Sequence, residues 1–392
     1  MSHAEPRRRT ESFRSFDPAD DAAAPAGWVA DFEPFDYLHF AKTRMPGARF
    51  PLCVSGVPSV APLFDAETFR RSFETGDLGS PLARWRSEMA ARFGVPGEHT
   101  YPTLGASGAV FVALSALAAY GADGRPPVAV EHPAYAVFRT VATLLGHPAT
   151  EVPRLAESGY GIDLDAVDAA FERGARVFCT TDLHNPTGVA LSRAEVEALD
   201  EIAARHDAWV LLDEAYREFL PGPVETAYRP GGRIVVTGSF TKVHGLGPMR
   251  AGWIFAPPEI LARAERVEEA ACGVPPSPWL ELLAASVAQA DALRDRGRAL
   301  AAAGRAVMDA WLAETPLVTW TPPAAGITGL VRVEGLRDSF AFSQRLRAEL
   351  DVQVVPGAFF GAEGAIRVSF GLPPETLRPA LDVLALGIPP LR

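Results

Sequence analysis

Short apolar runs alternate along the middle of the chain with longer segments whose apolar residues recur at helical spacing. This alternation is typical of crossover units around a mostly parallel sheet, so it predicts an α/β fold. The expected strands are residues 127–131, 176–180, 209–213, 233–238 and 251–255. Helices are expected to begin near Gly108, Tyr135, Ser192 and Pro257. The sequence Ser192-Arg-Ala-Glu195 predicts a capping box at the third of these starts.

The pattern changes after about residue 275. Residues 281–315 predict one long helix rich in Ala, Leu and Arg. The elements expected after it are strands near Leu317, Leu330, Val352 and Ala365 and a helix near Asp338. Because 392 residues also exceed what one hydrophobic core usually fills, we expect a large domain and a smaller, α+β domain that closes the chain.

The composition narrows the function classes. A net charge of −11 disfavours a broad electrostatic contact with nucleic acid or an anionic membrane and favours a small-molecule ligand. The three cysteines are too few for a disulfide framework or a zinc site, so we expect no metal and a reducing, cytoplasmic location. No window offers the roughly eighteen uninterrupted apolar residues of a membrane helix. Residues 1–26 lack the apolar segment of an export signal, so a disordered tail is expected there.

Two motifs suggest the chemistry. Lys242 follows an expected strand, with Ser239 before it and Arg250 after it, and Asp213 ends the apolar run 209–212. An amine that forms a Schiff base, a carboxylate that holds a pyridinium proton, and a Ser/Arg pair for a phosphate are what pyridoxal 5'-phosphate requires from a protein. Singly, the lysine would be a surface charge and the aspartate a loop residue paired with arginine. Together they predict a pyridoxal-phosphate site.

Three further motifs fit the same cofactor, although each has a plain structural alternative. Ser107-Gly108-Ala109 introduces a helical pattern and would offer backbone N–H groups to a phosphate, or act as an ordinary N-cap. Tyr135 follows an expected strand and would stack on a planar ring, or begin a core helix. Asn185, in Asn185-Pro-Thr-Gly188, would donate to the cofactor's phenolate oxygen, or simply belong to a turn.

Three other residues complete the expected site. Tyr216 lies three positions after Asp213 and would share the phenolate oxygen. Arg367 interrupts an apolar strand, where a guanidinium calls for a carboxylate, either of the substrate or of a structural ion pair. His184, just before Asn185, would be a wall or gate residue of the pocket, or simply belong to the turn.

As an ordered set, these residues resemble the class I/II aminotransferases of pyridoxal-phosphate fold type I over roughly residues 50–385. The resemblance implies a large domain with a mostly parallel seven-stranded sheet, a smaller α+β domain, and Lys242 as the catalytic Schiff-base lysine. The implied cofactor contacts are Ser107, Gly108, Ala109, Tyr135, Asn185, Asp213, Tyr216, Ser239, Lys242 and Arg250. The implied substrate contacts are Gly56, Asn185 and Arg367.

The resemblance also implies domain limits and a partner. Residues 27–60 form an N-terminal segment on the small domain and active site, residues 61–275 the large domain, and residues 276–392 the small domain. A homodimer with sites at the subunit interface is implied. The sequence departs from the family pattern at Phe73-Glu-Thr-Gly-Asp, where a tyrosine often reaches the partner's phosphate, and at Gly247-Pro248.

The expected activity is amino-group transfer between an L-amino acid and a 2-oxo acid by a ping-pong mechanism. A lyase, decarboxylase or oxidase of specialised metabolism is the alternative, because the same apparatus serves those reactions. A non-catalytic sensor is disfavoured, since the sequence has no helix-turn-helix extension or basic patch. The substrate is open: Arg44 would suit a second carboxylate, whereas Tyr37, Phe359 and Phe360 would line an apolar pocket.

Overall fold

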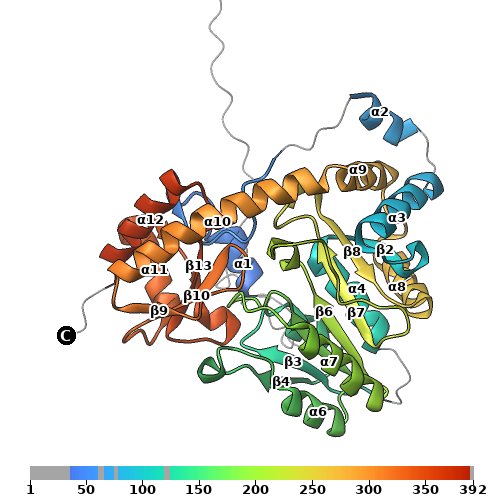
Figure 1. The fold of residues 1–392 in the computed structure, drawn as a ribbon, viewed down its shortest axis with the longest axis horizontal. Coiled ribbons are helices and arrows are strands. Elements are labelled where there is room, and N and C mark those ends of the chain that lie inside the picture. The colour runs from blue at the N-terminus through green and yellow to red at the C-terminus, as the bar shows by residue number, and fades with distance from the viewer. Residues whose placement is uncertain (1–35, 61–65, 75–77, 119–123, 389–392) are drawn as a thin grey trace, which may run out of the picture. The chain divides into compact units, whose positions relative to one another are not determined.

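A seven-stranded sheet lies within residues 100–255 of the computed structural model (Figure 1). Its strand order is β2-β8-β7-β6-β5-β3-β4, and only β8 runs antiparallel to both of its neighbours. The strands are β2 (Thr100–Leu104), β3 (Val128–His132), β4 (Ala149–Pro153), β5 (Val177–Thr181), β6 (Trp209–Asp213), β7 (Ile234–Ser239) and β8 (Ala251–Phe255). The expected α/β fold with a mostly parallel sheet is therefore confirmed.

The five strands expected from the sequence are all present, each within one residue of its expected limits. The sequence did not indicate β2 and β4. Strand β2 contains Pro102, and β4 is an edge strand with the half-polar sequence Ala-Thr-Glu-Val-Pro, so neither forms a continuous apolar run.

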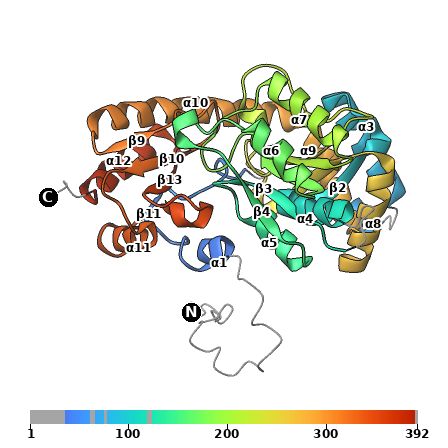
Figure 2. The same cartoon turned by 90° about the horizontal axis from the view of Figure 1, so that it is seen from below.

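Helices cover both faces of the sheet (Figure 2). One layer contains α4 (Gly105–Ala118), α5 (Val137–Leu144) and α8 (Pro258–Cys272), and the other contains α3 (Gly79–Phe93), α6 (Leu164–Glu172), α7 (Arg193–Arg205) and α9 (Ser277–Val287). The predicted capping box begins α7: Ser192 Oγ accepts from the Glu195 N–H at 3.2 Å, and Glu195 Oε2 accepts from the Ser192 N–H at 2.7 Å.

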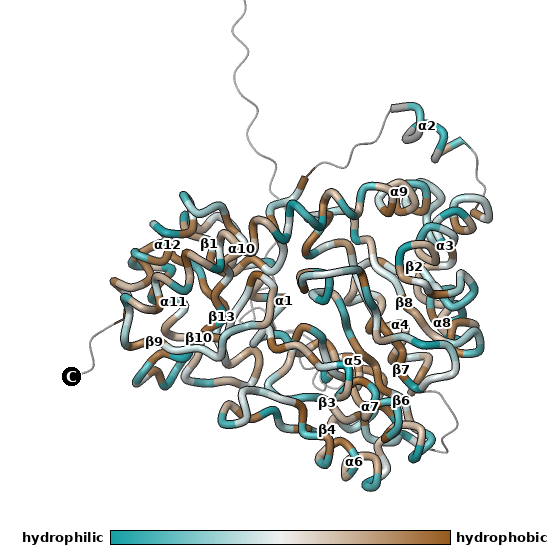
Figure 3. The backbone as a smooth tube through the Cα atoms, viewed as in Figure 1, coloured by the Kyte–Doolittle hydropathy of each residue, from teal (hydrophilic) through white to brown (hydrophobic). Residues whose placement is uncertain are grey.

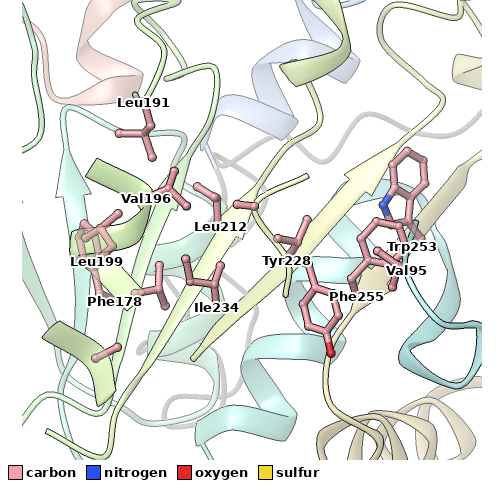
Figure 4. Close-up of a cluster of buried hydrophobic side chains, with 14 of the residues drawn as sticks. Val95, Phe178, Leu191, Val196, Leu199, Leu212, Tyr228, Ile234, Trp253 and Phe255 are labelled. Atoms are coloured by element: carbon pink, nitrogen blue, oxygen red, sulfur yellow. The ribbon is translucent and has the colours of Figure 1, made fainter. Parts of the chain in front are cut away.

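The large core lies between the sheet and the α6–α7 layer (Figure 4). Phe178, Leu212 and Val236 come from three adjacent parallel strands and are completely buried. Burying a side chain of this size contributes about 1.5–3 kcal/mol, so a core built from many of them holds the strand ends in fixed register. In Figure 3 strands β6 and β7 are mostly brown, as expected for strands covered on both faces.

A smaller set of elements follows the large sheet. Helix α10 (Ala290–Glu314) leads to a four-stranded antiparallel sheet in the order β12-β13-β10-β9, packed with α11 (Ser339–Leu350) and α12 (Pro374–Leu386). The strands are β9 (Val318–Trp320), β10 (Thr328–Val333), β12 (Val355–Pro356) and β13 (Ala365–Ser369). A short parallel pair joins β1 (Phe50–Pro51) to β11 (Val352–Gln353).

The expectation of one long helix over 281–315 was wrong. The structure has two helices, α9 and α10, separated at Ala288 and Gln289. No Gly or Pro marks this break. The Gln289 side chain instead donates to the Ala285 carbonyl at 3.1 Å, an interaction that the apolar pattern does not reveal.

The structure describes residues 36–60, 66–74, 78–118 and 124–388. Gly47 to Arg392 forms one compact unit; the other, Met1 to Pro46, contains α1 (Asp36–Thr43), and a further short helix, α2, spans Ala66–Glu74. The tail expected over 1–26 lies outside the described residues. None of the described helices combines the length and the apolar character that crossing a membrane requires.

Candidate active site

The motif residues gather at one edge of the large sheet. Strands β3, β5, β6 and β7 are parallel, so their carboxyl ends meet there, and Asp213 and Ser239 are the last residues of β6 and β7. Strand β8 runs the other way and therefore brings Arg250, the residue before it, to the same edge. Because Leu104 pairs with Ala251, the start of α4 lies beside Arg250.

Gly105 and Arg250 form a narrow, positively charged corner. Gly105 has a φ of +76°, and a Cβ on it would overlap the Arg250 guanidinium. Arg250 itself adopts a left-handed backbone with φ 53°, following a 3₁₀ turn that Gly247-Pro248 begins. Ser107 and Gly108 lie in the first turn of α4, whose N–H groups have no partners within the helix. A guanidinium beside a helix N-terminus suits a phosphate group.

Asp213 is buried at the end of β6, with 7% of its surface exposed. Its Oδ1 accepts from the Ala215 N–H at 3.1 Å. Burial raises the pKa of this carboxyl to about 6, although the Ala215 N–H, the Thr237 side chain and the Lys242 charge act in the opposite direction. A carboxylate in this position is favoured by a cationic partner, and a protonated pyridine nitrogen is one.

Lys242 lies in the turn after β7, above Tyr216. Its Nζ donates to Ser55 Oγ at 3.0 Å and lies 5.3 Å from the centroid of the Tyr216 ring. The Tyr216 hydroxyl donates to the Ser55 carbonyl at 2.7 Å, and burial raises the pKa of this phenol. Gly56 follows directly, and a Cβ on it would lie 3.0 Å from the Thr241 carbonyl oxygen.

Arg367 brings the small sheet to the same place. It lies on β13 with 1% of its surface exposed, and its Nη1 donates to Asn185 Oδ1 at 3.2 Å. Its Nη2 donates to the Cys53 carbonyl at 3.4 Å, and its guanidinium carbon lies 5.0 Å from the centroid of the Phe360 ring. Since Asn185 uses its oxygen on Arg367, its Nδ2 can donate to a ligand.

The remaining expected residues lie nearby, with different surroundings. The Ser239 hydroxyl is buried, donates to Thr241 Oγ1 at 2.6 Å and accepts from the Thr241 N–H at 3.0 Å. Tyr135 lines a cavity of about 240 Å³ together with Phe359 and Phe360.

A buried polar network supports the Asn185 loop, and the sequence did not reveal it. Glu131 Oε2 accepts from Arg154 at 2.8 Å, and Glu131 Oε1 accepts from the Thr181 hydroxyl at 2.6 Å. Thr181 Oγ1 in turn accepts from the Asn185 N–H at 3.0 Å. In the sequence, β3 and β5 can be recognised only as short apolar runs. Glu131 and Thr181 lie at the ends of these runs and do not interrupt them.

The expectation of His184 as a gate was wrong. Its side chain is fully buried, with ring nitrogens 2.6 Å from Thr187 Oγ1 and 2.8 Å from the Pro133 carbonyl. Burial lowers its pKa well below the usual range. His184 therefore joins two loops as a neutral structural residue.

Comparison with known proteins agrees with this geometry. The model of the class I and II aminotransferase family matches residues 78–384. The chain belongs to this family. This aminotransferase is 30% identical over 312 residues to the arginine–pyruvate transaminase of Pseudomonas aeruginosa, covering 74% of the chain and 75% of that relative. It is 29% identical over 308 residues to the capreomycidine synthase of Streptomyces vinaceus, covering 77% and 78%.

Solved structures agree on the fold. A pyridoxal-phosphate-dependent aminotransferase from Streptococcus suis superposes with a TM-score of 0.80 at 24% identity, covering 91% of this chain and 97% of that one. The aminotransferase is thus a pyridoxal-phosphate enzyme of fold type I, and its substrates are an amino acid and a 2-oxo acid. The buried Asp213 carboxylate and the Gly105–Arg250 corner are features that this cofactor fits.

Proposed function

We propose that Lys242 is the lysine that binds pyridoxal phosphate covalently and moves the proton during amino transfer. The observation that carries this proposal is the meeting of Lys242, the buried Asp213 and the Gly105–Arg250 corner at one sheet edge. The chain has only two lysines, Lys42 and Lys242, so the choice of a Schiff-base amine is narrow. Lys42 is exposed in the last turn of α1.

The residues proposed to hold the cofactor divide by the group that each would contact. Asp213 would keep the pyridine nitrogen protonated, and Tyr135 would lie against the ring. Asn185 would donate its Nδ2 to the phenolate oxygen. Tyr216 would share that oxygen by releasing the Ser55 carbonyl, to which its hydroxyl donates, or by accepting a hydrogen bond from a protonated cofactor oxygen.

The phosphate would be held by the start of α4, through Ser107, Gly108 and Ala109, and by Arg250. The Ser239 hydroxyl would join them by turning its proton away from Thr241 Oγ1. Bound pyridoxal phosphate withdraws electrons from the substrate α carbon, so that a proton can leave that carbon.

Arg367 would hold the substrate's α-carboxylate through two parallel N–H donors, with Gly56 and Asn185 beside it. Lys242, once its amine is free, would accept the α proton and return it to the cofactor, acting as a general acid and base. Water supplies the carbonyl oxygen when the amino acid leaves as a 2-oxo acid, and the reverse steps deliver the amino group to a second 2-oxo acid and release one water. Over both halves, one amino group and one α hydrogen pass from donor to acceptor, and no water is consumed.

We also propose a homodimer in the cytoplasm, with the domain boundary between α9 and α10. The support is the family resemblance, the separate sheets over residues 100–255 and 318–369, and the packing of α9 against α3 in the large core, which moves the boundary beyond the expected residue 275.

The test is a nitrogen balance on the purified, cofactor-loaded enzyme. L-arginine and L-aspartate are the first donors to try, because named relatives act on arginine and aspartate, and pyruvate is a first acceptor. The proposal predicts one new amino acid per donor consumed, without free ammonia. Release of ammonia or carbon dioxide in place of a new amino acid would contradict it, and the synthase among the relatives makes that control necessary.

A further inference from the structure

Ser55 presents its hydroxyl to the Lys242 amine. Lys242 Nζ donates to Ser55 Oγ at 3.0 Å, and Ser55 is half-buried. The proposed proton transfer uses the same amine, and a hydroxyl within hydrogen-bond distance of it can set the direction in which the amine points.

Contacts on both sides fix the position of this hydroxyl. The Ser55 carbonyl accepts from the Tyr216 hydroxyl at 2.7 Å, and the Val57 N–H donates to the Lys242 carbonyl at 3.2 Å. Between them Gly56 leaves no space for a larger residue against the Thr241 carbonyl. The segment is therefore attached to the lysine turn by its backbone, independently of the Ser55 side chain.

The same segment is attached to the carboxylate side of the site. The Cys53 carbonyl accepts from Arg367 at 3.4 Å, and the Leu52 carbonyl accepts from the Ser369 N–H at 2.8 Å. Ser55 thus lies on a short strap between Arg367 and Lys242, the residues proposed to hold the substrate carboxylate and to move its α proton.

From this geometry we infer that Ser55 is a positioning residue for proton transfer: its hydroxyl orients the free Lys242 amine toward the substrate α carbon. The inference rests on the proposed role of Lys242. Loss of this hydrogen bond would widen the range of Lys242 rotamers, and a smaller part of that population would reach the α carbon. The hydroxyl adds no chemistry of its own, since the proton passes between the α carbon and Nζ.

The test compares Ser55→Ala and Ser55→Thr with the control Ser59→Ala, which removes an exposed hydroxyl from the same segment. The first readout is covalent capture of pyridoxal phosphate by cofactor-free protein, followed by visible absorbance after rapid mixing. Ser55→Ala should slow the first-order capture phase about tenfold, part of the hundredfold or more that a placed acid–base group contributes. The concentration-dependent binding phase should not change.

The second readout is exchange of the substrate α hydrogen with solvent deuterium, measured by NMR. Ser55→Ala should slow this exchange about tenfold and enlarge the α-deuterium isotope effect, whereas Ser55→Thr and Ser59→Ala should stay near the wild-type values. Exchange and isotope effect unchanged in Ser55→Ala, or as impaired in Ser55→Thr, would overturn the inference. Failure of the underlying proposal is distinguishable, because Lys242→Ala would then still capture the cofactor covalently.

Discussion

Arg367 Nη1 donates to the Asn185 side-chain oxygen over 3.2 Å, which joins β13 of the small sheet to the loop that follows β5 of the large one. The pair orients the guanidinium and also determines which end of the Asn185 amide is available to a ligand. A binding site for a carboxylate therefore depends on both sheets.

Replacement of Arg367 by Lys should raise KM for the amino acid and lower kcat/KM on the order of a hundredfold. Lysine keeps the charge but cannot form two parallel hydrogen bonds to a carboxylate, and it leaves Asn185 without this donor. Steady-state kinetics with the best donor measure the effect. Cofactor absorbance should be unchanged, and an unchanged kcat/KM would exclude the proposed role of Arg367.

The Asp213 pKa predicts a pH-dependent stability. In the cofactor-free protein this pKa is raised from 3.8 to about 6, so between these values the folded state binds a proton that the unfolded state has released. The free energy of unfolding should therefore fall as the pH rises through this window. Urea unfolding should show a smaller fall in Asp213→Asn than in the wild type; part of the fall should remain, because burial also raises the pKa of Glu214, to about 7.

The same group predicts pH-dependent cofactor binding. Ionised Asp213 attracts a protonated pyridine nitrogen, so the affinity for pyridoxal phosphate should increase as the pH rises through about 6. In Asp213→Asn the affinity should depend less steeply on pH, and the remaining dependence should come from the cofactor's phosphate, whose second ionisation is also near pH 6. Equal slopes in the two proteins would show that Asp213 does not sense the cofactor.

Gly105→Ala should weaken cofactor binding by displacing Arg250. A Cβ at this position would overlap the guanidinium, and the positive φ adds backbone strain. Gly94→Ala is the matched control, because Gly94 also has a positive φ but no atom within 4 Å of a Cβ. We expect an increase in Kd of at least about tenfold for Gly105→Ala and an unchanged Kd for Gly94→Ala, measured by equilibrium dialysis. Similar values for both would remove Arg250 from the phosphate site.

Glu131→Gln should destabilise the protein by about 3 kcal/mol, because it leaves the buried Arg154 guanidinium without a negative partner. Glu197→Gln breaks an exposed ion pair with Arg193, which solvent screens, so the free energy of unfolding should change far less. Urea unfolding of the two variants gives the comparison. If the free energy of unfolding fell equally in both variants, the Glu131–Arg154 pair would not be a main support of the Asn185 loop.

Much of this arrangement was predictable because its residues are constrained locally. Strands β6 and β7 are buried on both faces, so they form continuous apolar runs, and polar residues at their ends, such as Asp213, stand out. Ser192 and Glu195 cap α7 through contacts three residues apart, which a sequence can reveal.

The residues that were missed depend on distant contacts. Ser55 reaches Lys242 across 187 positions, and although the family resemblance places the adjacent Gly56 beside the substrate, nothing in the sequence pairs the Ser55 hydroxyl with the lysine. Glu131 binds Thr181 across 50 positions, inside two strands whose apolar runs it does not disturb. The break between α9 and α10 contains no Gly or Pro, and the hydrogen bond from the Gln289 side chain to the Ala285 carbonyl found there has no local sequence signal.

The most direct test of the central claim is to reduce the cofactor-loaded enzyme with borohydride, digest it and locate the added mass. With only Lys42 and Lys242 in the chain, the outcome is nearly binary. We expect the reduced pyridoxal phosphate on the Lys242 peptide, its loss in Lys242→Arg, and its retention in Lys42→Arg. Modification of Lys42, or no covalent adduct in a loaded and active enzyme, would contradict the account.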